Sequence, residues 1–348
     1  MRVIIIGGGI IGAALARHLV EGGADVTVLE GGGGATPASF GWVNASYFLN
    51  PDHFALRAEG IAAWKRLGGC VTWTGCLAWE DEGADFDAQK QMLEDLGYDV
   101  SEVDATQFAQ LEPHIAAPER ALRYATEGIA TPVETTRHLL RDVRRITGVR
   151  VLGIAHEAGR VTGVDTAQGV IAADRVVVAA GIGSPGLLAS VGVAMPMLKR
   201  PGVMVRTTAV APLFRHILVA PGQELRQDAA GHIWAPGVAQ HQSDDAEAPP
   251  AQVDALADAT LGRVRAVLGD VDLRWDHVML AERPVPQDGL PVFGPCGPDG
   301  LFAAVMHSGV TLAAITAELL GAQVLDQGLS NVQTALAAPF DPGRFQSG

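Results

Sequence analysis

Lysine is scarce in this chain of 348 residues, whose only lysines are Lys65, Lys90 and Lys199. Lysine and arginine together number 25 against 39 acidic side chains, which gives a formal net charge of −14. Proteins that bind nucleic acid neutralise its phosphates with lysine and arginine. The sequence therefore predicts no nucleic-acid partner.

Cysteine is equally sparse, and its three copies, Cys70, Cys76 and Cys296, are too few for a disulfide framework. A reducing compartment, the cytoplasm, is the simplest expectation. Every long apolar run is interrupted by glycine, proline or a polar side chain, so we expect no membrane-spanning segment. The ten histidines are scattered without the spacing of metal ligands, so we expect no metal site.

The N-terminal segment carries the most specific pattern in the chain. Residues 3–6 form a short, wholly apolar run, which is typical of a strand buried on both faces. Gly7, Gly9 and Gly12 follow it with G-x-G-x-x-G spacing and open an alanine-rich helix that ends at residues 22–23. A second strand over residues 25–29 ends on Glu30.

The glycines and the helix start suit a bound dinucleotide. Gly7 permits the tight turn, Gly9 lets a pyrophosphate approach the backbone, and Gly12 lets the helix pack close to the strand. The helix N-terminus, at Ile10 and Ile11, faces the phosphates with its free N–H groups.

Glu30 completes the pattern, because a carboxylate there accepts hydrogen bonds from a ribose 2′-OH and so favours NAD or FAD over NADP. The alternative is a glycine-rich turn in some other α/β protein, which does not explain the acid. The motif alone does not separate NAD from FAD.

The remaining sequence alternates between helix and strand patterns, and 48% apolar residues allow a substantial core. Helices are expected over residues 57–67, 86–96, 133–146, 253–268 and 310–320. Strands are expected over residues 160–164, 170–178, 203–208, 216–220, 225–227, 232–235, 273–280 and 301–306. The chain thus opens as parallel α/β, passes through an antiparallel middle and returns to a strand-then-helix end.

Further motifs follow the glycine loop in a fixed order. They are ASFG at residues 38–41, RVVVAAG at 175–181, ERPVPQDGLPVFG at 282–294 and HSGVTL at 307–312. In this order the segments resemble those of FAD-dependent amine and amino-acid oxidoreductases of the D-amino-acid oxidase type, which include glycine oxidase, sarcosine oxidase and D-amino-acid dehydrogenase. The last two segments are the specific ones, because NAD-dependent Rossmann enzymes do not carry them near the C-terminus.

The resemblance implies an α/β fold with two domains. One is a discontinuous Rossmann-like FAD-binding domain over residues 1–80, 130–200 and 281–348. The other is a substrate domain built on an antiparallel sheet, over residues 81–129 and 201–280. Sarcosine oxidases attach flavin to a cysteine near the start of the fourth segment, where this chain has Arg283, and Cys296 lies beyond it. We therefore expect noncovalent FAD.

The resemblance also assigns cofactor contacts outside the glycine loop. The backbone N–H groups that open the last helix are expected to face flavin O2, where a helix N-terminus stabilises the negative charge of reduced flavin. The segment at residues 151–154 that would contact the adenine is left open. The expected contacts are Ser39, Gly41, Trp42, Ala180, Gly181, Ser308, Gly309, Val310, Thr311 and Leu312.

Three residues are candidates for catalysis. Arg283 is expected to grip a substrate carboxylate, because a guanidinium is planar, bidentate and always charged; a structural ion pair with Glu282 or Asp288 is the alternative. His307 is expected beside the flavin or the substrate, or else as a helix cap. Asn44 is expected beside the flavin ring.

The middle of the chain supplies weaker candidates. The roof of the substrate cavity is expected to include some of His216, His232, Trp234 and His241.

These residues favour FAD-dependent oxidation of a small amino acid or secondary amine to an imine by hydride transfer to flavin, followed by hydrolysis to a keto compound. The alternatives are a 2-hydroxy-acid dehydrogenase, a noncatalytic flavin-binding subunit of a larger complex and an NAD-dependent dehydrogenase. The electron acceptor is expected to be oxygen or a quinone. No lysine falls in a flavin-facing motif, which favours a dehydrogenase over an oxidase. An oligomer or a partner subunit is compatible with the sequence.

Overall fold

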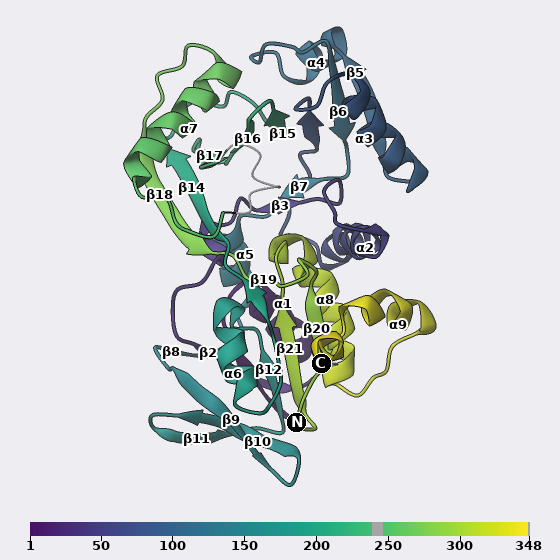
Figure 1. The fold of residues 1–348 in the computed structure, drawn as a ribbon, viewed down its shortest axis with the longest axis vertical. Helices are drawn as coiled ribbons and strands as arrows, with labels where there is room; N and C mark the ends of the chain where they lie inside the picture. Colours follow the sequence, from purple (N-terminus) through teal and green to yellow (C-terminus); the bar gives the residue numbers. More distant parts are fainter. Residues whose placement is uncertain (239–245, 347–348) are drawn as a thin grey trace.

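A computed structural model describes residues 1–238 and 246–346 of the chain. Its strands form two large sheets, one in the lower half of the molecule and one at the top in Figure 1. The chain passes between them several times, so neither sheet comes from one continuous stretch of sequence.

The lower sheet has six strands. Its order is β20 (Val292–Pro295), β21 (Leu301–Val305), β12 (Arg175–Val178), β1 (Arg2–Ile6), β2 (Asp25–Glu30) and β8 (Arg144–Thr147). All neighbours are parallel except β20, which runs antiparallel to β21 at one edge. The apolar run at residues 3–6, which the sequence predicts as a buried strand, forms β1 in the interior of this sheet.

Side chains of β1 alternate between two apolar layers, as strand geometry requires. Val3 and Ile5 pack with α1 (Ile10–Glu21) and α8 (Gly309–Val324), and α2 (Pro51–Leu67) packs on α8. Ile4 and Ile6 face the opposite layer, which contains α6 (Ser184–Ala189) and a separate three-stranded sheet.

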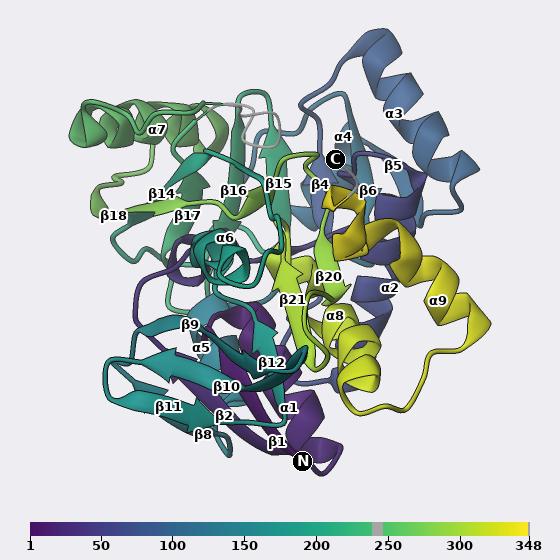
Figure 2. The same cartoon turned by 60° about the horizontal axis from the view of Figure 1, so that its bottom comes forward.

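That third sheet is antiparallel. It consists of β9 (Val151–Glu157), β10 (Arg160–Thr166) and β11 (Gly169–Ala172). Figure 2 shows it as its own layer in front of β1 and β12. The single strand expected over residues 170–178 is therefore wrong, because β11 pairs with β10 whereas residues 175–178 enter the six-stranded sheet as β12.

The upper sheet has eight strands. Its order is β18 (Trp275–Glu282), β14 (Pro201–Thr207), β17 (Ile233–Pro236), β16 (Gln223–Gln227), β15 (Ile217–Ala220), β4 (Cys76–Ala78), β6 (Arg120–Tyr124) and β5 (Val100–Asp104). Only β15 and β4 are parallel within it. The helices α7 (Val253–Leu268) and α4 (Ala105–Leu111) supply Leu261 and Phe108 to an apolar cluster with residues of this sheet.

The remaining elements lie outside the three sheets described above. They are α3 (Gly83–Asp95), α5 (Pro132–Leu139), α9 (Asn331–Ala337), the ladders β3 (Trp42–Val43) with β7 (Gly128–Ile129) and β13 (Met197–Leu198) with β19 (Val285–Pro286), and 3-10 turns at Thr36–Ala38, Gly181–Gly183, Ala338–Phe340 and Pro342–Phe345. The expected α/β class, with a nucleotide sheet that the chain leaves and re-enters and a mainly antiparallel second sheet, is confirmed. The domain limits stay a prediction; β4 lies in the eight-stranded sheet although the limit at residue 80 assigns it to the other domain.

The helix expected over residues 133–146 is wrong in its second half. α5 ends at Leu139, and Arg144–Thr147 forms β8 instead. β8 pairs in parallel with β2, from Thr27 opposite Arg144 to Glu30 opposite Thr147. Long-range pairing therefore overrides the local pattern.

α2 begins earlier than expected. The side chain of Asn50 accepts a hydrogen bond from His53 N at 2.8 Å, and Pro51 occupies the first turn. Asparagine at the cap with proline after it is a helix-start signal, so the start at Pro51 was readable from the sequence.

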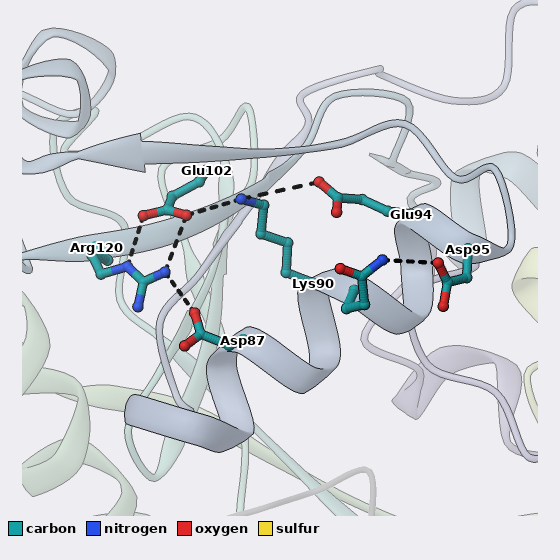
Figure 3. Close-up of polar contacts among 7 residues, drawn as sticks. Asp87, Lys90, Glu94, Asp95, Glu102 and Arg120 are labelled. Carbon is teal, nitrogen blue, oxygen red and sulfur yellow. Dashed lines mark hydrogen bonds and ion pairs between the residues drawn. The ribbon is translucent and has the colours of Figure 1, made fainter.

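An exposed ion-pair network joins α3 to the edge of the upper sheet (Figure 3). Arg120 on β6 contacts Glu102 on β5 and Asp87 on α3, each at 2.7 Å, and Lys90 contacts Glu102 at 3.1 Å. Because solvent screens exposed charges, this network is expected to orient α3 more than to stabilise the fold.

Across residues 1–238 and 246–346, no helix is both long and apolar enough to cross a bilayer. Nor do the side chains in those ranges form a cluster of three or more histidine, cysteine, aspartate or glutamate residues suited to a metal ion.

Candidate active site

A cavity of about 1100 Å³ is lined by residues of both large sheets. Ile6 and Val305 reach it from the six-stranded sheet, and Met204 and Ala281 from the eight-stranded sheet. It brings together most residues that the sequence singles out: Gly7, Gly9, Ile10, Ile11, Glu30, Ser39, Gly41, Trp42, Asn44, Ala180, Gly181, Arg283, His307, Ser308, Gly309, Val310 and Thr311. Gly12 and Leu312 do not line it.

The glycines at the start of α1 leave an open cradle. Gly7 has a φ of +112°, and a Cβ there would overlap the carbonyl oxygen of Ala179. A Cβ on Gly12 would overlap the carbonyl oxygen of Gly7, so Gly12 serves the packing of α1 on the turn. Gly9 faces the cavity, with Thr36 Oγ1 3.0 Å from where its Cβ would lie.

Glu30 lies beside this cradle. A Cβ on Gly8 would come within 3.0 Å of the Glu30 carboxylate, so glycine allows the acid to sit against the loop. Residues 31–34, which are all glycine, line the cavity next to it. Val151 and Leu152 also line it, which keeps them as candidates for the adenine contact.

The segment after β2 folds into a turn over the cavity. The Ser39 hydroxyl accepts a hydrogen bond from Gly41 N at 3.2 Å. Gly41 has a φ of +82°, and a Cβ there would overlap the carbonyl oxygen of Ala130. Ser39 thus makes the local turn; contact with the cofactor stays a prediction for it.

Trp42 and the residues that follow it are hydrogen-bonded to a buried acid, Glu127, which the sequence analysis did not identify. Glu127 accepts from the Trp42 indole nitrogen at 2.8 Å, from Ser46 N at 3.1 Å and from the Tyr98 hydroxyl at 2.7 Å. Burial raises the pKa of Glu127 to about 7 despite these donors. Glu127 lies just before β7, where no periodic pattern marks it as buried.

Arg57 is a second missed residue. It lines the cavity from α2 and is 3% exposed. Its position shares the buried helical face of Phe54, Ile61 and Trp64, so a cation on an apolar stripe was the available signal. Burial lowers the pKa of Arg57 to about 10, and it stays charged at neutral pH.

Three polar contacts fix the Arg57 guanidinium. Nε donates to the backbone oxygen of Asn44 at 3.1 Å, Nη2 donates to the Asn44 side-chain oxygen, and Nη1 donates to Ser308 Oγ at 2.6 Å. Arg57 therefore holds the Asn44 side chain in place, and the position of Asn44 beside the flavin ring stays a prediction.

Arg283 lines the cavity just after β18. Its Nε donates to the carbonyl oxygen of Arg200 at 3.2 Å and Nη2 to that of Pro201 at 3.3 Å. Glu282 and Asp288 are the carboxylates that the sequence offers as ion-pair partners of Arg283. Glu282 accepts a hydrogen bond from Arg200 N at 2.6 Å, and Asp288 pairs with Arg344 at 2.8 Å.

The residues just before α8 also line the cavity. His307 lines the cavity, but the N-cap position of α8 belongs to Ser308, whose φ is +55°. Thr311 Oγ1 accepts from Asn44 N at 3.3 Å and donates to the Trp42 carbonyl oxygen at 3.1 Å. The helix start and the segment at residues 42–44 therefore form one bonded unit.

Ala180 and Gly181 line the cavity directly after β12, where Gly181 has a φ of +56° and opens a 3-10 turn. The roof candidates do not line it. His216 bonds to Glu112, with Nδ1 and Oε1 2.5 Å apart, and His232 and Trp234 bond to neighbours near their own strand. His241 lies outside the described residues.

The lining fits FAD. The cradle at Gly7 and Gly9 has the shape that a pyrophosphate requires, Glu30 can accept from a ribose, and Asn44 and Ser308 offer polar groups to a ring. Cys296 does not line the cavity, so the expected noncovalent attachment has no competing cysteine there.

Fold and cavity together define a flavin-dependent oxidoreductase. The family model described as DAO, FAD dependent oxidoreductase, matches residues 2–323, and the chain belongs to this family. The cofactor is accordingly FAD.

The chain is similar in sequence to flavin-dependent relatives, in one case over nearly its whole length. Glycine oxidase of Pseudomonas aeruginosa is 25% identical over 347 residues, which cover 92% of this chain and 93% of the relative. A D-amino acid dehydrogenase of Cereibacter sphaeroides is 32% identical over 196 residues, which cover 54% of this chain and 43% of the relative. The structure of glycine oxidase from Geobacillus kaustophilus matches the fold with a TM-score of 0.83, at 23% identity and 99% coverage of both chains.

Proposed function

We propose that this protein oxidises a small amino acid or secondary amine to an imine, which water then hydrolyses to a keto compound. The observation that carries the proposal is Arg283 on the wall of the cavity that also holds the glycine cradle. Bound FAD supplies the hydride acceptor. The names of the relatives, glycine oxidase and D-amino acid dehydrogenase, support an amino-acid substrate.

In this proposal Arg283 orients the substrate. Its guanidinium grips the carboxylate of the amino acid, so that the carbon bearing nitrogen stays close to the ring. A Cβ on Gly202 would lie 3.3 Å from Arg283 Cδ, so the glycine at that position leaves room for this side chain.

The residues that line the cavity leave little choice of base. The acids among them are Glu30, beside the glycine loop, and Glu282, which accepts from Arg200 N. His307 is the one imidazole among these lining residues. We therefore propose that the site selects the neutral amine, because a cationic nitrogen cannot support positive charge developing on its carbon.

The electron acceptor in the proposal is oxygen or a quinone. Lys65, Lys90 and Lys199 are all absent from the cavity lining that the described residues form. This favours a dehydrogenase that passes electrons to a quinone. The proposed location is the cytoplasm.

An anaerobic screen of amino acids, N-alkyl amino acids and 2-hydroxy acids tests the function. The flavin absorbance band should bleach with at least one primary or secondary amino acid, and the product should react as a keto compound. Bleaching by 2-hydroxy acids alone would contradict amine oxidation and favour a 2-hydroxy-acid dehydrogenase. A yellow protein that no compound bleaches would favour a noncatalytic flavin subunit.

A further inference from the structure

Arg57 is a buried cation that acts as the donor in each of its hydrogen bonds. Its three hydrogen bonds go to the Asn44 backbone oxygen, the Asn44 side chain and Ser308 Oγ. A guanidinium has no acceptor atom. The Asn44 amide must therefore turn its oxygen, and not its nitrogen, toward Arg57.

This contact fixes where the Asn44 amide nitrogen lies. Because the amide is planar, Nδ2 lies on the side away from Arg57. Asn44 is 4% exposed and lines the cavity. Its Nδ2 atom remains accessible to solvent. Within residues 1–238 and 246–346 this nitrogen makes no hydrogen bond. Its two N–H groups therefore open onto the cavity.

The same arginine ties this amide to the start of α8. Nη1 donates to Ser308 Oγ, and Thr311 Oγ1 joins the helix to Asn44 N and to the Trp42 carbonyl oxygen. Ser308 and Thr311 also line the cavity. One buried guanidinium thus sets the orientation of the amide and its distance from the helix N-terminus.

We propose that Arg57 is a positioning residue that holds the Asn44 amide with its N–H groups turned into the cavity, where they donate to the electron-rich edge of the FAD ring. The inference rests on FAD binding and is independent of the substrate. Donors fixed in this way stabilise the negative charge that the ring gains on reduction, because they need no reorientation. The fixed charge of Arg57 behind the amide acts in the same direction.

Sulfite binding tests the proposal without substrate turnover. Sulfite adds reversibly to oxidised flavin and places negative charge on the ring, so its dissociation constant, read from the bleached absorbance, reports how well the protein stabilises that charge. Asn44→Asp keeps the contact with Arg57 but has no N–H to donate. Loss of one such bond should weaken sulfite binding roughly tenfold. The midpoint potential of the bound FAD should become more negative in the same variant.

Arg57 variants separate orientation from charge. Arg57→Met frees the amide to rotate and should weaken sulfite binding at least as much as Asn44→Asp. Arg57→Lys should restore part of the effect, because it keeps the charge but cannot span three acceptors. Arg66→Met is the matched control, since Arg66 lies on the same helix and pairs at the surface with Glu59 and Glu318; it should leave sulfite affinity unchanged.

If Arg57→Met does not fold, the Asn44→Asp variant still tests the proposal, because that variant retains Arg57 and its buried contacts. An Asn44→Asp protein that holds FAD with sulfite affinity and potential equal to the unaltered protein overturns the proposal. Failure of every amine to bleach the flavin would instead contradict the proposed function and leave this test intact.

Discussion

The indole nitrogen of Trp42 donates to the carboxylate of Glu127 at 2.8 Å, so a side chain of the cavity wall is held by an acid that the protein seals from water. The other carboxylate oxygen accepts from Ala45 N, Ser46 N and the Tyr98 hydroxyl. The segment that carries Asn44 therefore lies between two buried ionisable groups, the acid Glu127 and the base Arg57.

Glu127 should make stability depend on pH. Its pKa rises from 4.5 to about 7 on folding, so the folded protein binds the proton more tightly than the unfolded chain. The stabilisation is complete below the unfolded pKa and is lost as pH rises through the folded one. Between these limits the loss should be roughly 3 kcal/mol of unfolding free energy. Urea denaturation from pH 5 to pH 8 measures it.

Glu127→Gln should flatten that profile, because the amide has no charge to bury. The three donors to Oε1 should hold the single amide oxygen at that position, which leaves the NH2 group, which cannot accept, facing the indole. The fluorescence of Trp42 should therefore shift. Glu119→Gln, on an exposed glutamate, is the control and should keep the slope. An unchanged slope in Glu127→Gln would assign the pH dependence to other groups.

A valine at Gly9 should yield an apoprotein. Gly9 lines the cavity at the start of α1, and the larger side chain would occupy the path of the pyrophosphate. Gly262→Ala, inside α7 with no atom near its Cβ, is the control and should retain FAD. The ratio of flavin to protein absorbance gives the result. A yellow Gly9→Val protein would show that the phosphates bind elsewhere.

Attachment of the cofactor is checked on the same preparations. Heat or acid precipitation should release all flavin into the supernatant. Flavin that remains with the pellet and fluoresces on a denaturing gel would contradict noncovalent binding.

The parallel sheet could be predicted because its strands carry their own signals. Residues 3–6 and 176–178 are apolar on both faces, and the glycine loop marks the turn between β1 and α1. α7 has the bounds that its periodicity predicts, residues 253–268. β8 could not be found in this way, because Arg144–Thr147 is a strand only through its pairing with β2.

The cavity residues also divide into those that local motifs predict and those that only long-range contacts place there. Motifs locate Gly7, Glu30 and Arg283 on its wall, because each motif has a local reason for its residues. Arg57 is different, since its contacts join α2 to Ser308, 251 residues away. A contact between residues so far apart produces no local sequence motif. The one local signal is a charged residue on an apolar helical face.

Arg283 should govern substrate affinity. If it grips a carboxylate, Arg283→Ala loses a charge-assisted pair worth about 2–5 kcal/mol, which raises the apparent substrate constant about thirty-fold to several thousand-fold. FAD should remain bound. Arg283→Lys should recover only part of the loss, because lysine cannot form the bidentate contact. Near-normal turnover in Arg283→Ala would make Arg283 structural and place the anchor elsewhere.

Reduction of the flavin by an amine substrate should become faster as pH rises through one ionisation, that of the bound amine. His307→Asn should keep this profile and change only the flavin spectrum, because no proton passes through the imidazole. Anaerobic stopped-flow absorbance from pH 6 to pH 10 measures both. Loss of the ionisation in His307→Asn would make His307 the base.

Arg226 offers a test of the cost of a buried charge. It is fully buried, its Nε donates to the Phe40 carbonyl oxygen, and its guanidinium carbon lies 4.6 Å from the centre of the Trp234 ring. Neither Nη atom has a partner within residues 1–238 and 246–346. Burial lowers the pKa of Arg226 to about 10, so the charge remains at neutral pH. Asp228 and Glu134 attract this charge, but no carboxylate of the described residues is in ion-pair contact with it. Burying an ion in this way costs several kcal/mol, more than one hydrogen bond returns.

Arg226→Met should therefore be at least as stable as the unaltered protein in urea denaturation at pH 7, since methionine fills similar space without charge. Arg57→Met is the informative contrast, because it removes three hydrogen bonds and should lower stability. A loss of more than about 2 kcal/mol in Arg226→Met would show that the Phe40 and Trp234 contacts outweigh the desolvation of the charge.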